Sequence, residues 1–189
     1  MTPTTMNKKD VYVSLEFTPN PNTLKYVVSS QLLDRGAANF TDMASAEKRS
    51  PLAVKLLGIA GVSGVMIGRN FVTVTKTEEG DWDAVHQNAS SLIEKHLASD
   101  EPVLIGEDVA KEGQSETERQ IIEILDQEIR PAVAMDGGDI TFERYDDGIV
   151  YLHLQGACAG CPGATMTLKM GVENRLREAI PEIREVVAI

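Results

Sequence analysis

Two cysteines are the residues of this chain best suited to chemistry. They lie in the segment Gly156-Ala-Cys158-Ala-Gly-Cys161-Pro-Gly163, between an expected strand and an expected helix. Backbone N–H groups and the positive end of a helix dipole at such a position stabilise thiolate, the form that binds metals or attacks disulfides. The flanking glycines let backbone amides approach the sulfur atoms, or a bulky group bound to them, closely. The pattern predicts a thiolate site at Cys158 and Cys161.

Four kinds of site fit a Cys-x-x-Cys pair: a metal site, a dithiol–disulfide oxidoreductase, a zinc ion shared by two chains as a structural bridge, and two unreactive small residues in a glycine-rich turn. Cysteines this close in sequence cannot join distant parts of a fold by closing a long loop. A site like that of thioredoxin would follow a central parallel strand, whereas the strand here is expected to be half of a local hairpin. Topology therefore disfavours the oxidoreductase.

The number of available ligands predicts a dimer. Zinc and cubane iron–sulfur clusters both take about four protein ligands, and the chain has two cysteines and three histidines, His86, His96 and His153. Strand alternation places His153 opposite the apolar face of its strand, which favours a surface histidine, and the two helical histidines are interpreted in the same way. The missing ligands are then expected from Cys158 and Cys161 of a second copy across a two-fold axis.

Composition excludes several classes of partner. The formal net charge is −11, from 18 basic and 29 acidic residues, which argues against nucleic acid because phosphate binding needs a concentrated basic surface. No apolar run approaches the roughly 20 residues that cross a bilayer, so no membrane partner is expected. The first ten residues lack both the apolar stretch of a secretory signal and the Arg-rich start of a transit peptide, although processing would remove such a peptide. A cytoplasmic protein is expected.

The 189 residues exceed the usual size of one domain and predict two small α+β domains, each a small sheet packed by helices. We expect a first domain over 1–98, an acidic, solvated linker over 99–116 and a second domain over 117–189. In the first, the sequence patterns predict these elements: strands over 11–17 and 24–29, a helix starting at Ser50-Pro51, strands over 62–67 and 71–76, and a helix over 81–97.

The second domain is expected to have the order α-β-β-α-β. Ser115-Glu-Thr-Glu118 fits a capping box, and the helix that it begins should stop at Arg130-Pro131. Strands over 140–145 and 149–155 flank the turn residues Asp146-Asp147-Gly148. A helix from about 168 to 179 and a last strand over 183–189 complete the domain.

Several spaced motifs resemble a known family. Residues 117–189 resemble the C-terminal domain of NifU-like (Nfu) proteins, and residues 11–97 resemble their N-terminal scaffold-type domain. The C-terminal motifs are Asp136-Gly-Gly-Asp139-Ile140, Leu154-x-Gly156-x-Cys158-x-x-Cys161-Pro162 and Thr167-Leu168-Lys169-x-Gly171-x-Glu173. The N-terminal motifs are Pro19-Asn20-Pro21-Asn22-Thr23-Leu24-Lys25, Ser50-Pro51-Leu52-Ala53 and Phe71-Val72-Thr73-Val74-Thr75.

The resemblance implies an iron–sulfur cluster scaffold or carrier rather than an enzyme. It implies that Cys158 and Cys161 of two subunits of a homodimer bind one bridging [4Fe-4S] cluster. Upstream cluster-assembly proteins would supply this cluster, and apo iron–sulfur proteins would receive it. Only the resemblance selects iron–sulfur over zinc; a dithiol oxidoreductase and a zinc-bridged structural dimer remain the alternatives.

Other notable side chains receive structural interpretations. Asp136 and Asp139 are expected to bond local backbone around Gly137-Gly138. Trp82 is expected in the core. Met166 and Met170, at helical spacing, are expected to pack inside the protein rather than to contribute to the site.

Overall fold

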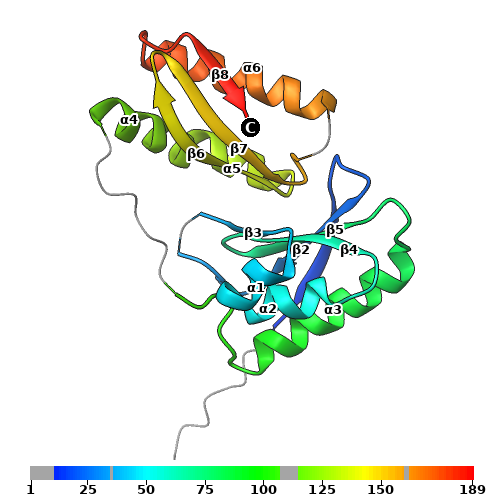
Figure 1. Ribbon diagram of the computed structural model, residues 1–189. Helices are drawn as coiled ribbons and strands as arrows, with labels where there is room; N and C mark the ends of the chain where they lie inside the picture. The colour runs from blue at the N-terminus through cyan, green and yellow to red at the C-terminus, as the bar shows by residue number, and fades with distance from the viewer. Residues whose placement is uncertain (1–10, 35, 107–114, 160–161) are drawn as a thin grey trace, which may run out of the picture.

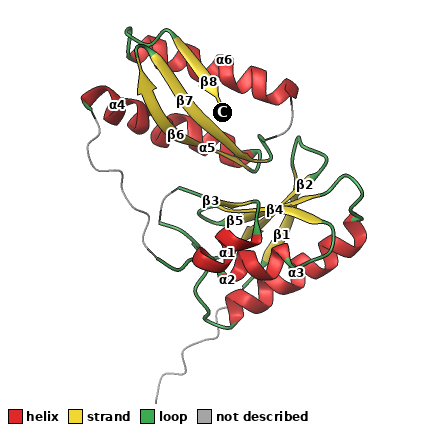
Figure 2. Cartoon of the chain, viewed as in Figure 1, coloured by secondary structure: helices red, strands yellow, loops and turns green. Residues whose placement is uncertain are grey.

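Alternating apolar strands and striped helices bury their apolar faces in two places along this chain. The computed structural model describes residues 11–34, 36–106, 115–159 and 162–189. Over these ranges the elements form two units, each with its own sheet, helices and apolar core (Figures 1 and 2). The predicted α+β class is confirmed. No helix in these ranges is both long enough and apolar enough to cross a membrane.

The first unit is an antiparallel sheet with helices on one face (Figure 1). In the part that the structure describes, five strands lie in the order β1-β2-β5-β4-β3. The elements are β1 (Val13–Phe17), β2 (Thr23–Val28), β3 (Ala38–Phe40), α1 (Met43–Arg49), α2 (Pro51–Leu57), β4 (Val62–Ile67), β5 (Phe71–Lys76) and α3 (Trp82–Ala98). The predicted strands and helices are confirmed. The sequence patterns missed β3 and α1, because β3 is too short to show alternation and α1 lacks an apolar stripe.

Ser50 links the start of α2 to the segment that follows α3. Its hydroxyl accepts from Ala53 N–H at 3.0 Å as an N-cap, as predicted, and donates to the Val103 carbonyl at 2.6 Å. Val103 and Leu104 pack against the first core, so the expectation of a solvated segment is wrong for these two residues. Burial of their side chains outweighs the acidic character of the surrounding sequence.

The second unit has a three-stranded sheet over the described residues, in the order β6-β7-β8. Its elements are α4 (Glu116–Ile124), the π-helical turn η1 (Leu125–Ile129), α5 (Arg130–Met135), β6 (Gly138–Asp146), β7 (Ile149–Gly156), α6 (Pro162–Ala179) and β8 (Glu185–Ala188). The predicted capping box is present, with Ser115 and Glu118 bonding each other's backbone N–H groups at 2.8 and 3.2 Å. The predicted β6–β7 hairpin is confirmed, with Asp147 and Gly148 at φ 41° and 83°.

The first helical segment of this unit does not stop at Arg130-Pro131 as predicted. It continues to Met135, because the wider turn η1 intervenes and Arg130 N–H bonds the Leu125 carbonyl, five residues back. Pro131 therefore lies in the first turn of α5, where its missing N–H costs little.

β7 is the central strand of the second sheet. It pairs antiparallel with β6 and parallel with β8, and α6 connects β7 to β8. The argument against a dithiol oxidoreductase was that the strand before the cysteines is half of a hairpin. Because β7 also begins a βαβ unit, that argument is weaker than the sequence suggested.

Candidate functional site

The residues around Cys158 lie between the central strand and the long helix of the second unit. β7 ends at Gly156, whose φ of 63° turns the chain, and α6 begins at Pro162. This is the position predicted for the cysteine pair. Cys158 is 8% exposed and packs in the second core, while Cys161 lies outside the described residues. We call residues 157–159 the cysteine loop.

Gly138 leaves the space that the Cys158 side chain occupies. A Cβ atom at position 138 would lie 2.2 Å from Cys158 Sγ and 3.0 Å from Cys158 Cβ. Real atoms do not approach so closely, so any side chain at 138 would displace the sulfur. The motif glycine at this position is therefore required by packing against the cysteine.

A groove of about 420 Å³ opens beside Cys158 between α5 and α6. Its walls are mainly apolar or small side chains, with one carboxylate: Ala132, Val133, Asp136, Cys158, Gly163, Thr167 and Leu168. The helices that form it also carry three exposed methionines, Met135, Met166 and Met170, at 75, 67 and 61% exposure. The prediction that Met166 and Met170 pack inside the protein is wrong, because no described element covers that side of α6.

Side chains bond three consecutive carbonyl groups of the cysteine loop. The Asn20 amide nitrogen Nδ2 donates to the Ala157 carbonyl at 3.3 Å and to the Ala159 carbonyl at 3.2 Å. The Thr165 hydroxyl donates to the Cys158 carbonyl at 3.3 Å. Asn20 belongs to the first unit, in the turn between β1 and β2 that reaches the second unit in Figure 1. Sequence reasoning missed both residues; the Pro19-Asn20-Pro21-Asn22 motif was the available signal for Asn20 and was used only for the family resemblance.

Lys25 makes a second contact between the units. Its Nζ donates to the Met135 carbonyl at 3.1 Å and pairs with Glu16 at 2.9 Å, and it lies 5.1 Å from the centroid of the Phe71 ring. The Lys25 side chain is only 9% exposed, so its charge is compensated by these groups. The contact places β2 against the end of α5, next to Gly137 and to Gly138 at the start of β6.

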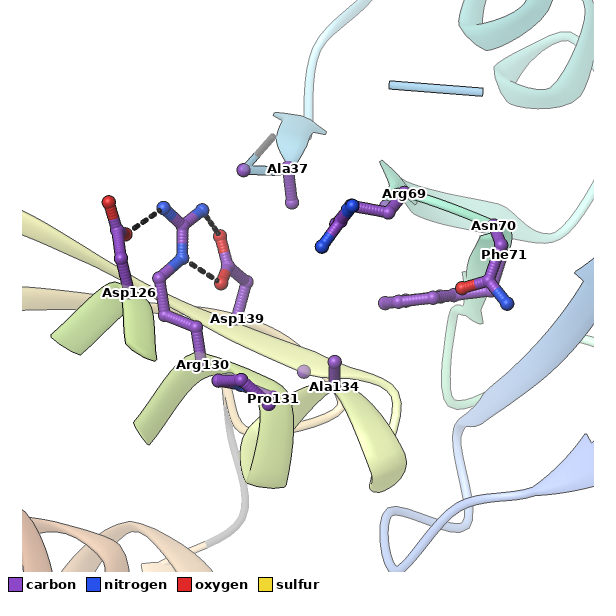
Figure 3. Close-up of a pocket in the computed structure, with 12 residues that line it drawn as sticks. Ala37, Arg69, Asn70, Phe71, Asp126, Arg130, Pro131, Ala134 and Asp139 are labelled. Carbon is purple, nitrogen blue, oxygen red and sulfur yellow. Dashed lines mark hydrogen bonds and ion pairs between the residues drawn. The ribbon is translucent and has the colours of Figure 1, made fainter. Parts of the chain in front are cut away.

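A cavity of about 290 Å³ lies between the units (Figure 3). Arg69, Asn70 and Phe71 line one side of it, and Arg130 and Asp139 line the other. Arg130 donates from Nε and Nη2 to the two carboxylate oxygens of Asp139, at 2.8 and 2.7 Å. The expectation that Asp139 bonds only local turn backbone is therefore wrong. Desolvation lowers the pKa of Arg130, but the hydrogen bonds and charges of Asp139 and Asp126 outweigh it and raise the pKa above its ordinary value.

The three histidines have different environments. His153 is a surface residue, as predicted, with its side chain 43% exposed and Nδ1 3.2 Å from the Ile189 carbonyl oxygen. His96 is 2% exposed, so its interpretation as a surface residue is wrong. Its Nδ1 lies 3.1 Å from Lys55 Nζ, and its Nε2 lies 3.3 Å from the Pro102 carbonyl oxygen. Burial and then the nearby Lys55 charge lower the pKa of His96.

His86 and Trp82 lie at the edge of the first core. The His86 ring stacks on Tyr26, with Nδ1 3.2 Å from the Tyr26 hydroxyl, and burial raises the pKa of Tyr26 to about 12. Trp82 packs partly buried against the core, and its Nε1 donates to the Pro21 carbonyl at 3.0 Å. Over the described ranges, no three His, Cys, Asp or Glu side chains come together in a way that could hold a metal ion.

Each of the two units matches a known protein family. Residues 13–100 match the family described as scaffold protein Nfu/NifU N terminal, and residues 121–187 match the family described as NifU-like domain. The human protein named NFU1 iron-sulfur cluster scaffold homolog, mitochondrial, is 39% identical over 181 residues, which are 93% of this chain and 71% of that protein.

Two further matches are a plant protein and a solved structure. NifU-like protein 4, mitochondrial, of Arabidopsis thaliana is 36% identical over 188 residues, covering 95% of this chain and 66% of that protein. The solution NMR structure of a NifU-like protein from Saccharomyces cerevisiae is 24% identical, with a TM-score of 0.46, and the match covers 57% of this chain and 94% of that one.

The names of the human and plant relatives contradict the expectation of a cytoplasmic protein, because both are called mitochondrial. That expectation rests on the first ten residues, whose composition says little about the compartment in which a protein works. The family is clear because both units match its domains and because the match to the human relative covers 93% of this chain and 71% of that protein. The chain belongs to the Nfu family of NifU-like proteins.

Proposed function

We propose that this protein is an iron–sulfur cluster scaffold that binds a [4Fe-4S] cluster between two copies of the chain through Cys158 and Cys161. Upstream assembly proteins supply the cluster, and apo iron–sulfur proteins receive it. One observation carries the proposal: Cys158 borders a groove next to the start of α6, in a chain that is similar over most of its length to a protein named an iron–sulfur cluster scaffold.

Two copies are needed because each chain has only two cysteines. A cubane cluster takes about four protein ligands, and thiolates are its usual ones. A two-fold axis through the cluster would supply two identical pairs. The groove between α5 and α6 supports this arrangement, because its walls are mostly apolar or small and Cys158 lies at its border.

Transfer follows from thiolate exchange. An incoming client thiol loses its proton and replaces one protein thiolate on iron, and the released cysteine takes up a proton. Four such exchanges move the cluster without any change in its oxidation state. The start of α6 favours the thiolate form while the cluster is bound, because its N–H groups and dipole stabilise negative charge.

Anaerobic reconstitution with ferrous iron and sulfide tests the proposal. The expected product is a dimer with about four irons per two chains. Cys158→Ala and Cys161→Ala should each abolish it, whereas Thr167→Ala, which changes the groove wall but no ligand, should retain it. A reconstituted monomer, or a cluster that persists without either cysteine, would contradict the proposal. Purification with stoichiometric zinc would favour the zinc-bridged structural dimer.

The position of β7 favours a dithiol–disulfide oxidoreductase as the second candidate. A cysteine pair between a central strand and the helix that leads to a parallel strand is also suited to thiol–disulfide exchange. Metal-free protein would then reduce a disulfide substrate catalytically in the presence of a dithiol. The two functions separate cleanly, since this activity requires no iron and no dimer.

A further inference from the structure

Asn20 connects the first unit to the backbone on both sides of Cys158. Its Nδ2 bonds the carbonyl groups of Ala157 and Ala159, at 3.3 and 3.2 Å, across 137 and 139 residues of sequence. Its Oδ1 accepts from Asn22 N–H at 2.9 Å, and the whole residue is 7% exposed. Both N–H donors of this buried amide group and its oxygen therefore have a partner.

The turn that carries Asn20 is fixed independently of the cysteine loop. The Thr18 hydroxyl lies 2.9 and 2.8 Å from the Asn20 and Thr23 carbonyl oxygens, which share its one hydrogen, and its oxygen accepts from Asn20 N–H at 3.2 Å. The bond from Asn22 N–H to Oδ1 completes the turn. The two Nδ2 bonds are thus not needed to form the turn. They act on the cysteine loop.

In this position of the cysteine loop, Cys158 is withdrawn from the protein surface. Its Sγ packs against Gly138, and the residue is 8% exposed within the second core. A sulfur that binds iron shared with a second chain has to reach the surface. Movement of the loop toward the surface would shift the Ala157 and Ala159 carbonyls and break their bonds to Asn20.

We propose that Asn20 is a positioning residue of the cysteine site: it holds the loop in the withdrawn conformation, so that the first unit controls access to Cys158. Any effect of Asn20 on cluster binding rests on the proposed function, whereas its effect on the accessibility of the Cys158 thiol does not. Lys25 supports the same interface through its bond to the Met135 carbonyl. Loss of the Asn20 amide should therefore loosen the loop without separating the units.

Alkylation of Cys158 in the full chain measures this control. In a Cys161→Ala background Cys158 is the only thiol. Its rate of alkylation by iodoacetamide is measured at increasing pH, from below the ordinary thiol pKa of about 8.5 up to the pH at which the rate reaches a plateau. Asn20→Asp keeps the size of the side chain and the acceptor for Asn22 but cannot donate to the carbonyls. Asn20→Ala removes the donor without adding charge.

Asn22→Asp is the matched control. It adds the same charge in the same turn, and the Asn22 side chain makes no hydrogen bond to any described residue. Asn20→Asp and Asn20→Ala should each raise the plateau rate at least about tenfold, because both hydrogen bonds to the loop carbonyls are lost. Asn22→Asp should leave it unchanged. Lys25→Met, which loosens the interface from a different residue, should raise the plateau in the same direction.

Three outcomes would overturn the proposal: unchanged plateau rates in both Asn20 variants, an equal rise in Asn22→Asp, or a shift of the apparent thiol pKa in Asn20→Asp alone. The last would show that charge, rather than the lost donor, acts on the sulfur. If an Asn20 variant does not fold, the Lys25→Met rate decides. Reconstitution of the two-cysteine protein is read separately, so failure of cluster binding and failure of this proposal are distinguishable.

Discussion

The Arg130 guanidinium and the Asp139 carboxylate form a two-point ion pair, with donor–acceptor distances of 2.8 and 2.7 Å. The pair joins the start of α5 to the start of β6, and the Asp139 side chain is 5% exposed. Gly138, which accommodates the Cys158 sulfur, precedes Asp139 directly. The ion pair therefore stabilises the backbone against which the cysteine packs.

Loss of this pair should destabilise the protein strongly. Arg130→Ala leaves the Asp139 carboxylate buried without its main partner, which should lower the free energy of unfolding by about 3 kcal/mol. Arg175→Ala is the control, because Arg175 pairs with Glu128 at 2.7 Å but both side chains are well exposed; it should lower the free energy of unfolding far less than Arg130→Ala does. Urea denaturation measures both, and equal losses would show that the Arg130–Asp139 pair contributes no more than a surface pair.

Gly138→Ala should expel Cys158 from its position. The added methyl group would occupy the place of Sγ, so we expect a loss of about 2 kcal/mol in stability and faster alkylation of Cys158. Gly171→Ala is the matched change, since Gly171 lies exposed within α6 with nothing within 4 Å of its Cβ position. It should stabilise the protein by about 0.5–1 kcal/mol, as alanine favours helix. If Gly138→Ala changed neither the stability nor the rate of Cys158 alkylation, the close packing of the sulfur against Gly138 would be contradicted.

Met166→Glu should weaken the proposed cluster-bound dimer. Met166 is exposed on α6 beside the groove residue Thr167, and a two-fold axis near Cys158 would bring this side of each copy together. Two new like charges at that interface should raise the dimer dissociation constant about tenfold or more. Sedimentation of reconstituted protein measures this. Met43→Glu, on α1 of the first unit, should have no effect, and an unchanged constant for Met166→Glu would place the dimer interface elsewhere.

Acidification should destabilise the first unit through His96. Its folded-state pKa is lowered, so the unfolded chain binds a proton more readily than the folded one. The stability is fully present above the unfolded value of about 6.5 and is lost as the pH falls below it, by at most about 1.4 kcal/mol per pH unit. His96→Gln should flatten the urea-unfolding profile between neutral and mildly acidic pH. A slope in His96→Gln equal to that of the unchanged protein would contradict this role of His96.

The sequence by itself determined the local elements and the position of the site. Alternation, the capping box at Ser115 and the turn at Asp147-Gly148 specified strands and helices because they depend on residues close in the chain. The same local signals placed Cys158 between a strand and a helix. The number of cysteines predicted that a second copy must complete a cluster, a prediction that reconstitution can test.

Only the tertiary structure decided which distant groups meet. Asn20 reaches Ala157 across 137 residues, His96 is buried beneath Lys55 and Pro102, and Met166 stays exposed although it lies on an amphipathic-looking stretch. Helical or strand spacing shows which residues share a face. It does not show whether another element covers that face, or which polar group from elsewhere in the chain packs against it. Those choices follow from how the two sheets and their helices pack.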